Sequence, residues 1–542
     1  MKINALRRIL SIITYEKREI SAIYFYAVFS GLVQLALPLG IQSIISFVLG
    51  GAISTSLVLL IVFVVTSVFL NGLLQVNQMK IIEKIQQQLF VRYSFLYSHT
   101  IPTINLKGAQ KYFLPELVNR FFDTISLQKG LAKLLLDIPA ASIQILFGLI
   151  LLSFYHPVFI IFGLTLLTIL YLLLRYSGNR GLETSIEESD YKYKVAGWLE
   201  ELARVVTLFK FSGSKTMHIK KTDEGVSGYL EARTNHFKVL LFQYWSLIGF
   251  KIIITASMLI VGSFLLIDQQ LNIGQFIAAE IVILSLMGSV EKLIGNLDQV
   301  YDVLTSVEKL EKLSDLQKES TGAKDLEVRS QGIALKTEEL SFSYDEKQPI
   351  LNEVSLSVQP GEKVSIYGKL GAGTSTLLKV LTGAYQPYEG KIWVDQIPLS
   401  QINLASYRFQ TGIQFNYDEL FNGTIRENLT MGHEDIHDDD IYDLLKMVGL
   451  EKFVRSLPMQ LEYSLTTGAK HLSKKTMQKL VLVRALIHKP RLLLMDDPWN
   501  GLNDEEVRPI QEYILKSMPN TTAIIVTNDE WFQSQCNQII KL

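Results

Sequence analysis

The sequence predicts a membrane-embedded bundle of six α-helices followed by a soluble α/β domain. Three observations predict this fold class. The chain has 542 residues, of which 48% are hydrophobic and only 19% are charged, and its mean hydropathy is +0.23. The apolar residues gather in long runs in the N-terminal half rather than spreading evenly. From Ile333 onward, short β-branched runs alternate with helical patterns, which is typical of an α/β domain.

Six apolar runs are long enough to cross a bilayer, which takes about 17–25 residues. The first run is too long for a signal peptide and lacks a small-residue cleavage site. The long polar connections between the runs are compatible with helix, so we expect the spans to continue as helices outside the bilayer. The six expected spans are residues 21–49, 55–76, 138–155, 158–176, 239–267 and 273–290.

Lys and Arg near the span ends predict the orientation. Basic residues precede the first span and fill the long connections 77–137 and 175–238, whereas the short links hold His156 and Asp268 but no Lys or Arg. Both termini are therefore expected in the cytoplasm, with the spans in the plasma (inner) membrane. The basic, amphipathic stretch 2–20 is expected to lie along the membrane surface.

Composition and charge exclude several classes of protein. The net charge of -1 removes any whole-molecule argument for nucleic-acid binding, and the single cysteine, Cys536, excludes an internal disulfide and a multi-cysteine metal site. The polar segment after Val307 reads as a linker. The expected domains are the six-span region 1–310, the linker 311–330 and the soluble domain 331–542.

A glycine-rich loop lies between a strand and a helix of the soluble half. The strand KVSIYG runs into GKLGAGTST, and Gly368, Gly371 and Gly373 allow backbone N–H groups to approach a phosphate. The N-terminus of the following helix favours an anion. The glycines by themselves fit a turn with a purely structural role as well as they fit a phosphate-binding loop.

Further motifs occur in the expected order, and with them the soluble half resembles the nucleotide-binding domain of ATP-binding-cassette (ABC) transporters. Tyr344 matches the aromatic residue that stacks on adenine. LFNGTIRENLTMG matches the segment that touches the membrane domain, and LSKKTMQKLVLVRALIHKPRLLLMDDP matches the signature motif, its helix and the Walker B strand. The resemblance implies a six-span exporter subunit with an α/β P-loop ABC nucleotide-binding domain.

The resemblance implies ATP and Mg²⁺ as cofactors and a second ABC half-transporter as partner, in a homo- or heterodimer. Ser375, Asn416 and Asp496 match the Mg²⁺-binding positions, and Asp497 and Asn528 match the catalytic ones only weakly. The nucleotide-binding positions carried over are Tyr344, Gly368, Lys369, Gly371, Gly373, Thr374, Ser375, Thr376, Asn416, Ser473 and Asp496.

Several matched positions depart from the family pattern. The phosphate-binding lysine is replaced by Thr374, and a charged hydrogen bond of this kind is worth about 1.5–3 kcal/mol. Asp497 replaces a glutamate, and Asn528 replaces the switch histidine. The Q-loop glutamine aligns with Asn416, and the D-loop aspartate aligns with Asn503.

The signature glycines are also replaced, by Lys474 and Lys475. These lysines could reach a phosphate across a dimer, or they could simply be solvated. Lys369 could likewise replace the missing P-loop lysine or remain a solvated side chain. We therefore expect weak ATP binding and slow or absent hydrolysis, which leaves enzymatic activity open.

Two classes of function follow. The first is an exporter subunit that the cassette drives or gates; IGQFIA, at the start of the sixth span, resembles type-I-secretion transporters and implies a peptide or protein substrate. The second is a non-hydrolysing scaffold or regulator of a secretion complex, in contact with a periplasmic adaptor.

Lys251 and Glu280 are charges inside the expected spans, where such charges face a cavity or a partner. Glu280 could line a translocation cavity together with Lys251, or make a polar packing contact; their different depths make a direct pair marginal. His433–His437 matches the HExxH zinc-protease pattern but lacks an apolar helical context, so we expect no metal site there.

Overall fold

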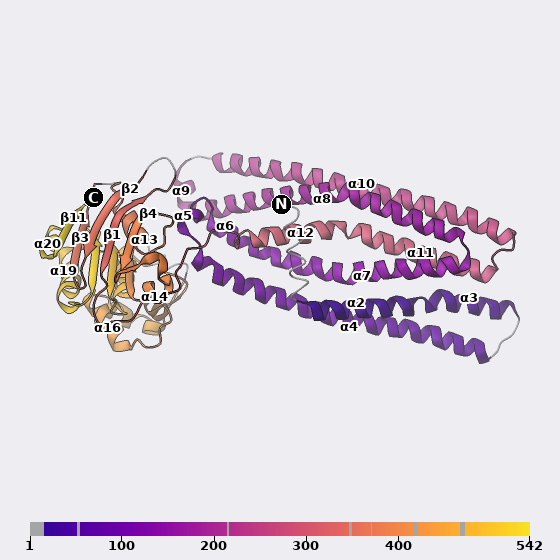
Figure 1. Cartoon of the computed structure of the whole chain (residues 1–542), viewed down its shortest axis with the longest axis horizontal. Helices are drawn as coiled ribbons and strands as arrows, with labels where there is room; N and C mark the ends of the chain where they lie inside the picture. The colour runs from indigo at the N-terminus through magenta and orange to yellow at the C-terminus, as the bar shows by residue number, and fades with distance from the viewer. Residues whose placement is uncertain are drawn as a thin grey trace. The chain divides into compact units, whose positions relative to one another are not determined.

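The computed structural model describes residues 16–50, 55–213, 216–345, 349–369, 371–415, 420–466 and 472–542. These form two compact units, one of Met1–Pro102 with Tyr112–Leu316 and the other of Thr103–Lys111 with Gln317–Leu542 (Figure 1). The expected surface stretch 2–20 lies mostly outside the described residues. Its last residues open the first long helix.

The described residues of the first unit form helices joined by short turns. Six stretches of these residues are long and apolar enough to cross a membrane, which confirms the expected six-span fold. Its helices are α2 (Lys17–Gln34), α3 (Ala36–Leu49), α4 (Thr55–Thr100), α6 (Leu114–Asn119), α7 (Asp123–Tyr155), α8 (Val158–Arg204), α9 (Val206–Phe211), α10 (Met217–Ile267), α11 (Ile273–Gly295) and α12 (Leu297–Glu311), with 3₁₀ turns at Ile101–Thr103 and Arg120–Phe122.

The first span differs from the single run that the sequence predicts. The helix is interrupted at Leu35, which separates α2 from α3. Pro38 explains the interruption, because proline has no N–H to donate to the carbonyl of Gln34 one turn earlier. The chain resumes helical bonding at once, since the N–H of Leu39 donates to the carbonyl of Leu35.

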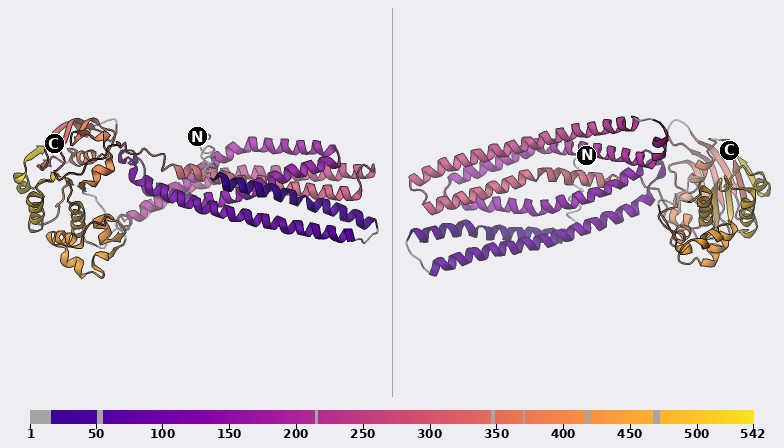
Figure 2. Two further views of the ribbon diagram at one scale, coloured as in Figure 1. Left: turned by 60° about the horizontal axis from the view of Figure 1, so that its bottom comes forward. Right: turned by 180° about the vertical axis from the view of Figure 1, so that it is seen from behind.

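The longest helices extend far beyond a bilayer. Helices α4, α8 and α10 have 46, 47 and 51 residues. At about 1.5 Å per residue each is roughly 70 Å long, more than twice the hydrocarbon thickness of about 30 Å. Helix α10 packs along α8, α11 along α7, and α2 along α4 (Figures 1 and 2). Neutral polar groups join α10 to α12 and α8: Gln243 Nε2 of α10 donates to Tyr301 OH of α12 at 2.8 Å and to Ser177 Oγ of α8 at 3.0 Å.

The second unit is built on two main sheets. A five-stranded parallel sheet has the order β11-β3-β10-β9-β6, and a four-stranded antiparallel sheet has the order β2-β1-β4-β5. Strands β3, β9 and β10 are mostly apolar and almost entirely buried, as expected for a parallel sheet covered on both faces. The strands are β1 (Leu335–Phe342), β2 (Leu351–Val358), β3 (Lys363–Tyr367), β4 (Glu389–Val394), β5 (Ile397–Pro398), β6 (Thr411–Gln414), β7 (Gly423–Thr424), β8 (Ser464–Leu465), β9 (Leu492–Asp496), β10 (Thr522–Val526) and β11 (Gln538–Lys541).

Short helices surround these sheets. The one following β3 is α13 (Thr374–Leu381), and α18 (Lys474–Leu486) precedes β9 (Figure 1). The others are α5 (Leu106–Ala109), α14 (Leu404–Phe409), α15 (Ile425–Thr430), α16 (Asp438–Met447), α17 (Glu451–Ser456), α19 (Asp504–Glu512) and α20 (Glu530–Gln535), with a short π-helix at Tyr513–Ser517 and 3₁₀ helices at Leu399–Gln401 and Gln460–Glu462.

Residues 103–111 precede most of the first unit in sequence yet pack with the second unit. Asn105 accounts for this: its backbone N–H donates to the carbonyl of Gln317, and its side-chain Nδ2 donates to the carbonyl of Gln386, both at 2.9 Å. Gln110 Nε2 also donates to Tyr385 OH at 3.1 Å. This short segment is therefore tied directly to the α/β unit.

Candidate functional site

The carboxyl ends of three neighbouring parallel strands define the site. Strands β3, β10 and β9 lie side by side and point the same way, so the segments that follow them meet at one edge of the sheet. Those segments carry the glycine-rich loop after Tyr367, the Thr527–Asn528 pair after Val526, and Asp497 after Asp496. Ligands of open α/β sheets bind at this kind of edge.

The glycine-rich loop has the backbone that its glycines allow. Gly371 and Gly373 both have φ of 88°, a left-handed conformation that other L-residues rarely adopt. A Cβ atom on Gly373 would also lie 2.9 Å from the carbonyl oxygen of Ile350. Gly373 is the N-cap residue of α13, whose first turn presents backbone N–H groups toward the loop. The local geometry therefore suits a bound phosphate.

A cavity of about 500 Å³ lies over this edge. It brings together most of the residues that the resemblance carried over, from four separate stretches of sequence. Its lining comprises Tyr344, Ile350, Tyr367, Gly368, Lys369, Gly371, Gly373, Thr374, Ser375, Thr376, Asp496, Asp497, Val526, Thr527 and Asn528. Asn416 lies outside the described residues, and Ser473 lies elsewhere in the unit, where its Oγ caps the start of α18.

The residues around the cavity carry too little positive charge to balance a polyphosphate. Among the described lining residues Lys369 is the one cation, whereas Asp496 and Asp497 are both acidic. Thr374 stands in the first turn of α13, where the resemblance leads us to expect a lysine. Ser375 and Asp496 lie at the same cavity and fit a Mg²⁺ ion held between a hydroxyl and a carboxylate.

Tyr344 lies at the cavity in a constrained position. Its hydroxyl forms a 3.0 Å hydrogen bond with Thr376 Oγ1, and its ring meets those of Phe342 and Tyr385 edge-on. The ring is therefore held beside the first turn of α13. A planar base could stack there without ordering a new side chain.

Asp497 has an unusual backbone and environment. Its φ of 48° is rare for a residue other than glycine, and it is fixed because its N–H donates to the carbonyl of Val526 at 2.8 Å. The pKa of the Asp497 carboxyl is raised, first by burial and then by the charge of Asp496. The turn therefore places a partly buried acid at the edge of the cavity.

Sequence reasoning missed Trp499, which joins the segments that follow strands β9 and β10. Its indole Nε1 donates to Thr527 Oγ1 at 3.0 Å, and its ring packs against Phe532. Trp499 is only 5% exposed. Thr527 immediately precedes Asn528, so Trp499 holds the segment that carries Asn528. A tryptophan directly after the Asp-Asp-Pro turn was the available signal.

Lys475, at the signature position, and Lys479, one turn further along α18, contact α19 of the same unit. Lys479 Nζ and Lys475 Nζ donate to the two carboxylate oxygens of Glu506 at 2.8 and 3.4 Å. The pKa of Glu506 is lowered to about 2, first by the donated N–H of Asn503 and then by Lys479. Lys474 forms no ion pair with any described residue. One of the two substituted positions is therefore engaged within the chain.

The charges in the spans do not pair with one another. Lys251 Nζ donates to Glu291 Oε2 at 2.6 Å. Glu280 has no hydrogen bond or ion pair within the described part of the chain, and neither Glu280 nor Lys251 lines the cavity of about 120 Å³ found between these helices. Gln144 and Ser285 line it and hydrogen-bond to each other.

The HExxH match forms no helix. Residues 433–437 lie in a turn before α16, and among the described residues no three His, Cys, Asp or Glu side chains are placed so that together they could hold a metal ion.

Comparisons with known proteins place these features in context. Residues 351–500 match the family model of the ABC transporter domain. The glutathione/L-cysteine transport system ATP-binding/permease protein CydC of Escherichia coli is 27% identical over 82% of this chain and 78% of its own length. A putative ABC transporter ATP-binding protein of Mycoplasma genitalium is 26% identical over 80% of this chain and 77% of its own length.

Two further comparisons concern secretion and fold. The colicin V secretion/processing ATP-binding protein CvaB of Escherichia coli is 30% identical over 52% of this chain and 40% of its own length. The structure of a bacterial Atm1-family ABC exporter with ATP bound has a TM-score of 0.86 at 17% identity, covering 97% of this chain and 93% of that one. The architecture is thus that of an ABC exporter.

Proposed function

Because the chain belongs to the ABC transporter superfamily and has the exporter fold, we propose that its cassette binds ATP weakly and hydrolyses it slowly or not at all. The charge of the nucleotide cavity carries this proposal. Thr374 supplies no cation there, while Asp496 and Asp497 add two carboxylates. A triphosphate therefore meets more repulsion and one fewer charged hydrogen bond.

The replacement of the P-loop lysine by Thr374 determines how much nucleotide binding is weakened. A charged hydrogen bond is worth about 1.5–3 kcal/mol, so its loss weakens nucleotide binding roughly ten- to hundredfold. Mg²⁺ held by Ser375, Asn416 and Asp496 would offset part of the repulsion. The chemical step suffers separately, since the Asp497 side chain is one methylene shorter than glutamate and holds a water about 1 Å out of place.

ABC exporters function as membrane dimers, and we propose that this chain pairs with a second half-transporter, either a copy of itself or a related chain. The working division is a span region 1–310, a linker 311–330 and a cassette 331–542. Both termini and the cassette face the cytoplasm, because Lys and Arg gather on the long connections.

The proposed substrate is a peptide or protein, delivered with a periplasmic adaptor. The support is IGQFIA at the start of the sixth span and the similarity to the colicin V secretion protein. Glu280, which lacks a partner among the described residues, would face this substrate during transport, while Lys251 is engaged with Glu291.

A second candidate function is that of a non-hydrolysing scaffold or regulator of a secretion complex. The observation that favours it is the hydrogen bond from Lys475 Nζ to Glu506. The lysine side chain and its ion pair occupy a position where only glycine would let the backbone approach a phosphate closely.

Titration of the full chain in lipid nanodiscs with Mg-ATP, followed by calorimetry, separates the two functions. The exporter proposal expects saturable binding in the millimolar range, whereas the scaffold expects no binding heat there. A dissociation constant for Mg-ATP in the micromolar range would contradict the proposed weak binding, whichever of the two functions the chain has. Empty nanodiscs and a titration with Mg-AMP serve as controls.

A further inference from the structure

Part of the stretch 311–330, which its polarity predicts to be a linker, is fixed to the second unit. Glu319 is at the centre of this attachment: its two carboxylate oxygens accept from Nη1 and Nη2 of Arg408 at 2.8 and 2.9 Å. The side chain of Glu319 is 11% exposed and that of Arg408 is 28% exposed. A two-point ion pair that is partly withdrawn from water holds its partners more firmly than a solvated surface pair does.

The same guanidinium group also contacts the helix that follows the glycine-rich loop. Arg408 Nε donates to the carbonyl of Thr382 at 3.1 Å. Thr382 is the C-cap residue of α13, at the end of a helix where carbonyls lack intrahelical partners and a nearby cation is favourable. One side chain therefore joins Glu319 to the end of α13, and the first turn of α13 lines the nucleotide cavity.

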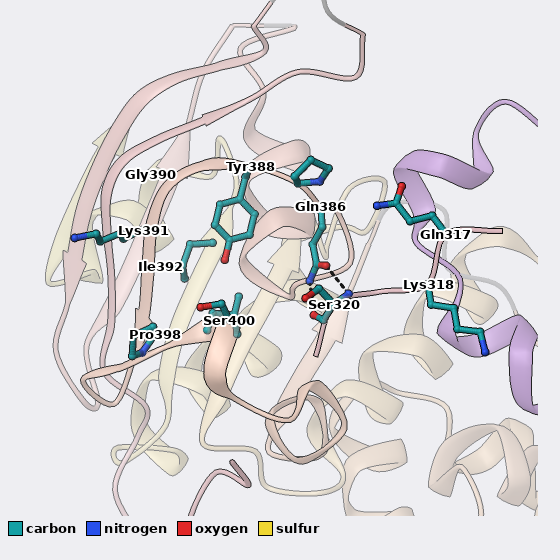
Figure 3. A pocket seen from close by; sticks show the side chains of 12 residues that line it. Gln317, Lys318, Ser320, Gln386, Tyr388, Gly390, Lys391, Ile392, Pro398 and Ser400 are labelled. Atoms are coloured by element: carbon teal, nitrogen blue, oxygen red, sulfur yellow. Dashed lines mark hydrogen bonds between the residues drawn. The ribbon is translucent and has the colours of Figure 1, made fainter. Parts of the chain in front are cut away.

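Gln386 makes a second connection between the same two stretches, beside a cavity of about 360 Å³ (Figure 3). The N–H of Ser320 donates to Gln386 Oε1 at 2.7 Å, and Gln386 Nε2 donates to the Ser320 carbonyl at 3.0 Å. Gln386 Nε2 also donates to the carbonyl of Gly383 at 3.1 Å, in the turn after α13. We call four residues the linker clamp: Glu319, Ser320, Gln386 and Arg408.

Segment 103–111 is attached to both sides of the linker clamp. On the side of the linker, the N–H of Glu319 donates to the carbonyl of Thr103 at 2.9 Å. On the side of α13, the carbonyl of Gln386 accepts from Asn105 Nδ2 at 2.9 Å. A change in the clamp therefore reaches this segment from two sides.

The course of the chain gives the clamp its consequence. The chain passes between the two units after Pro102, after Lys111 and after Leu316. The first two crossings connect segment 103–111 to α4 and α6, and the third connects the clamp to α12. Each of these covalent connections therefore enters the second unit at residues that the linker clamp joins to α13.

We propose that the linker clamp couples the nucleotide cavity to the chain that enters from the membrane helices, with Glu319 and Arg408 as its positioning residues. A ligand that orders the first turn of α13 stabilises the end of this helix, and with it the attachment of segment 103–111. Because such coupling is reciprocal, release of Glu319 from Arg408 loosens α13 and the segment together. The identity of the ligand rests on the proposed function, whereas the link between α13 and the segment does not.

Hydrogen–deuterium exchange of the full chain in nanodiscs, without nucleotide, tests the clamp. Glu319→Gln removes the charge of the pair and leaves Arg408 able to bond Thr382. We expect amide exchange to become about three- to tenfold faster in segment 103–111 and in peptides covering 374–386, although neither contains Glu319. Amides of β9 and β10 should exchange as in the wild type, which provides an internal reference.

Glu327→Gln is the matched control, because it removes a carboxylate from the same stretch of chain. Glu327 pairs with Arg329 at 2.7 Å, and both side chains are more than half exposed. This variant should leave exchange in segment 103–111 and in 374–386 unchanged, since a solvated pair outside the clamp holds neither of them.

Arg408→Lys provides a second variant, because lysine keeps the charge but lacks the planar fork that bonds Glu319 at two points. It should accelerate exchange in the same two regions. Combining it with Glu319→Gln should add little, since both changes break one interaction.

The proposal is overturned if Glu319→Gln changes exchange only within 317–326, if β9 and β10 loosen to the same extent, or if Glu327→Gln has an equal effect. The readout needs no nucleotide. A failure of Mg-ATP to bind would therefore contradict the proposed exporter function without affecting this result.

Discussion

At the scale of single residues, Thr374 has the largest expected effect on the nucleotide cavity. It lies in the first turn of α13, at a cavity whose described lining holds one lysine and two aspartates. Its hydroxyl can donate a hydrogen bond but brings no charge. Gly371 and Gly373 of the loop nevertheless both adopt left-handed φ, which suits the backbone to a bound phosphate.

Restoring the cation should therefore restore affinity without rebuilding the loop. We expect Thr374→Lys to tighten Mg-ATP binding about ten- to hundredfold, the value of a charged hydrogen bond. Calorimetric titration in nanodiscs measures the change. Thr374→Gln, of similar length but neutral, is the control; equal gains from both variants would show that charge is not what Thr374 lacks.

Asp497 gives a prediction about pH. Because burial and then Asp496 raise its pKa in the folded protein, the folded state holds the proton more tightly than the unfolded state does. The ionised carboxylate therefore costs stability above the raised pKa, and this cost disappears once the pH falls below the unfolded value, near 3.9.

Asp497→Asn should accordingly raise the unfolding temperature by a few degrees at about pH 8, with a smaller gain toward about pH 4. Differential scanning fluorimetry of the nucleotide-free chain across this range provides the measurement. A gain that is constant with pH, or larger in acid, is incompatible with a raised pKa.

At the scale of elements, helices α18 and α19 are joined by one carboxylate. Glu506 accepts from Lys479 and Lys475 on α18 and caps the start of α19 through the N–H of Asn503. A glutamine at this position keeps an acceptor for the cap and loses the ion pairs.

We expect Glu506→Gln to destabilise the cassette by roughly 0.5–1 kcal/mol, the value of partly exposed ion pairs. Chemical denaturation at neutral pH measures it. Glu512→Gln is the matched control, because Glu512 pairs with Lys516 at 3.4 Å on an exposed face and should change stability little. The account of α18 fails if Glu512→Gln costs as much as Glu506→Gln.

The sequence predicts the elements better than their connections. Six spans follow from hydropathy, and the loop follows from the spacing of Gly368, Gly371 and Gly373, because both signals are local. The interruption at Leu35 was not predicted, although Pro38 signals it, since the uncharged run hides a break in helical bonding.

Long-range partners escaped prediction for a different reason. Trp499 meets Thr527, and Glu506 meets Lys475 and Lys479, only after separate strands and helices have packed together. Nothing in the local spacing of these residues indicates which partner each will find. The same holds for Lys251, which lies against Glu291 rather than near Glu280.

At the scale of the whole molecule, the orientation can be tested by labelling with a membrane-impermeant maleimide. Burial raises the pKa of the native Cys536 thiol to about 12, so it should label slowly. In intact cells His156→Cys and Asp268→Cys, in the short links, should label rapidly, whereas Lys336→Cys should label only after the cells are opened. Labelling of Lys336→Cys in intact cells would reverse the proposed orientation.

We propose that this chain keeps the exporter fold while its cassette hydrolyses ATP slowly or not at all. The Mg-ATPase rate of the full chain in nanodiscs, compared with that of Asp497→Ala, tests this proposal. We expect a rate near background that Asp497→Ala leaves almost unchanged. A rate comparable to that of ordinary exporters, abolished by Asp497→Ala, would contradict it.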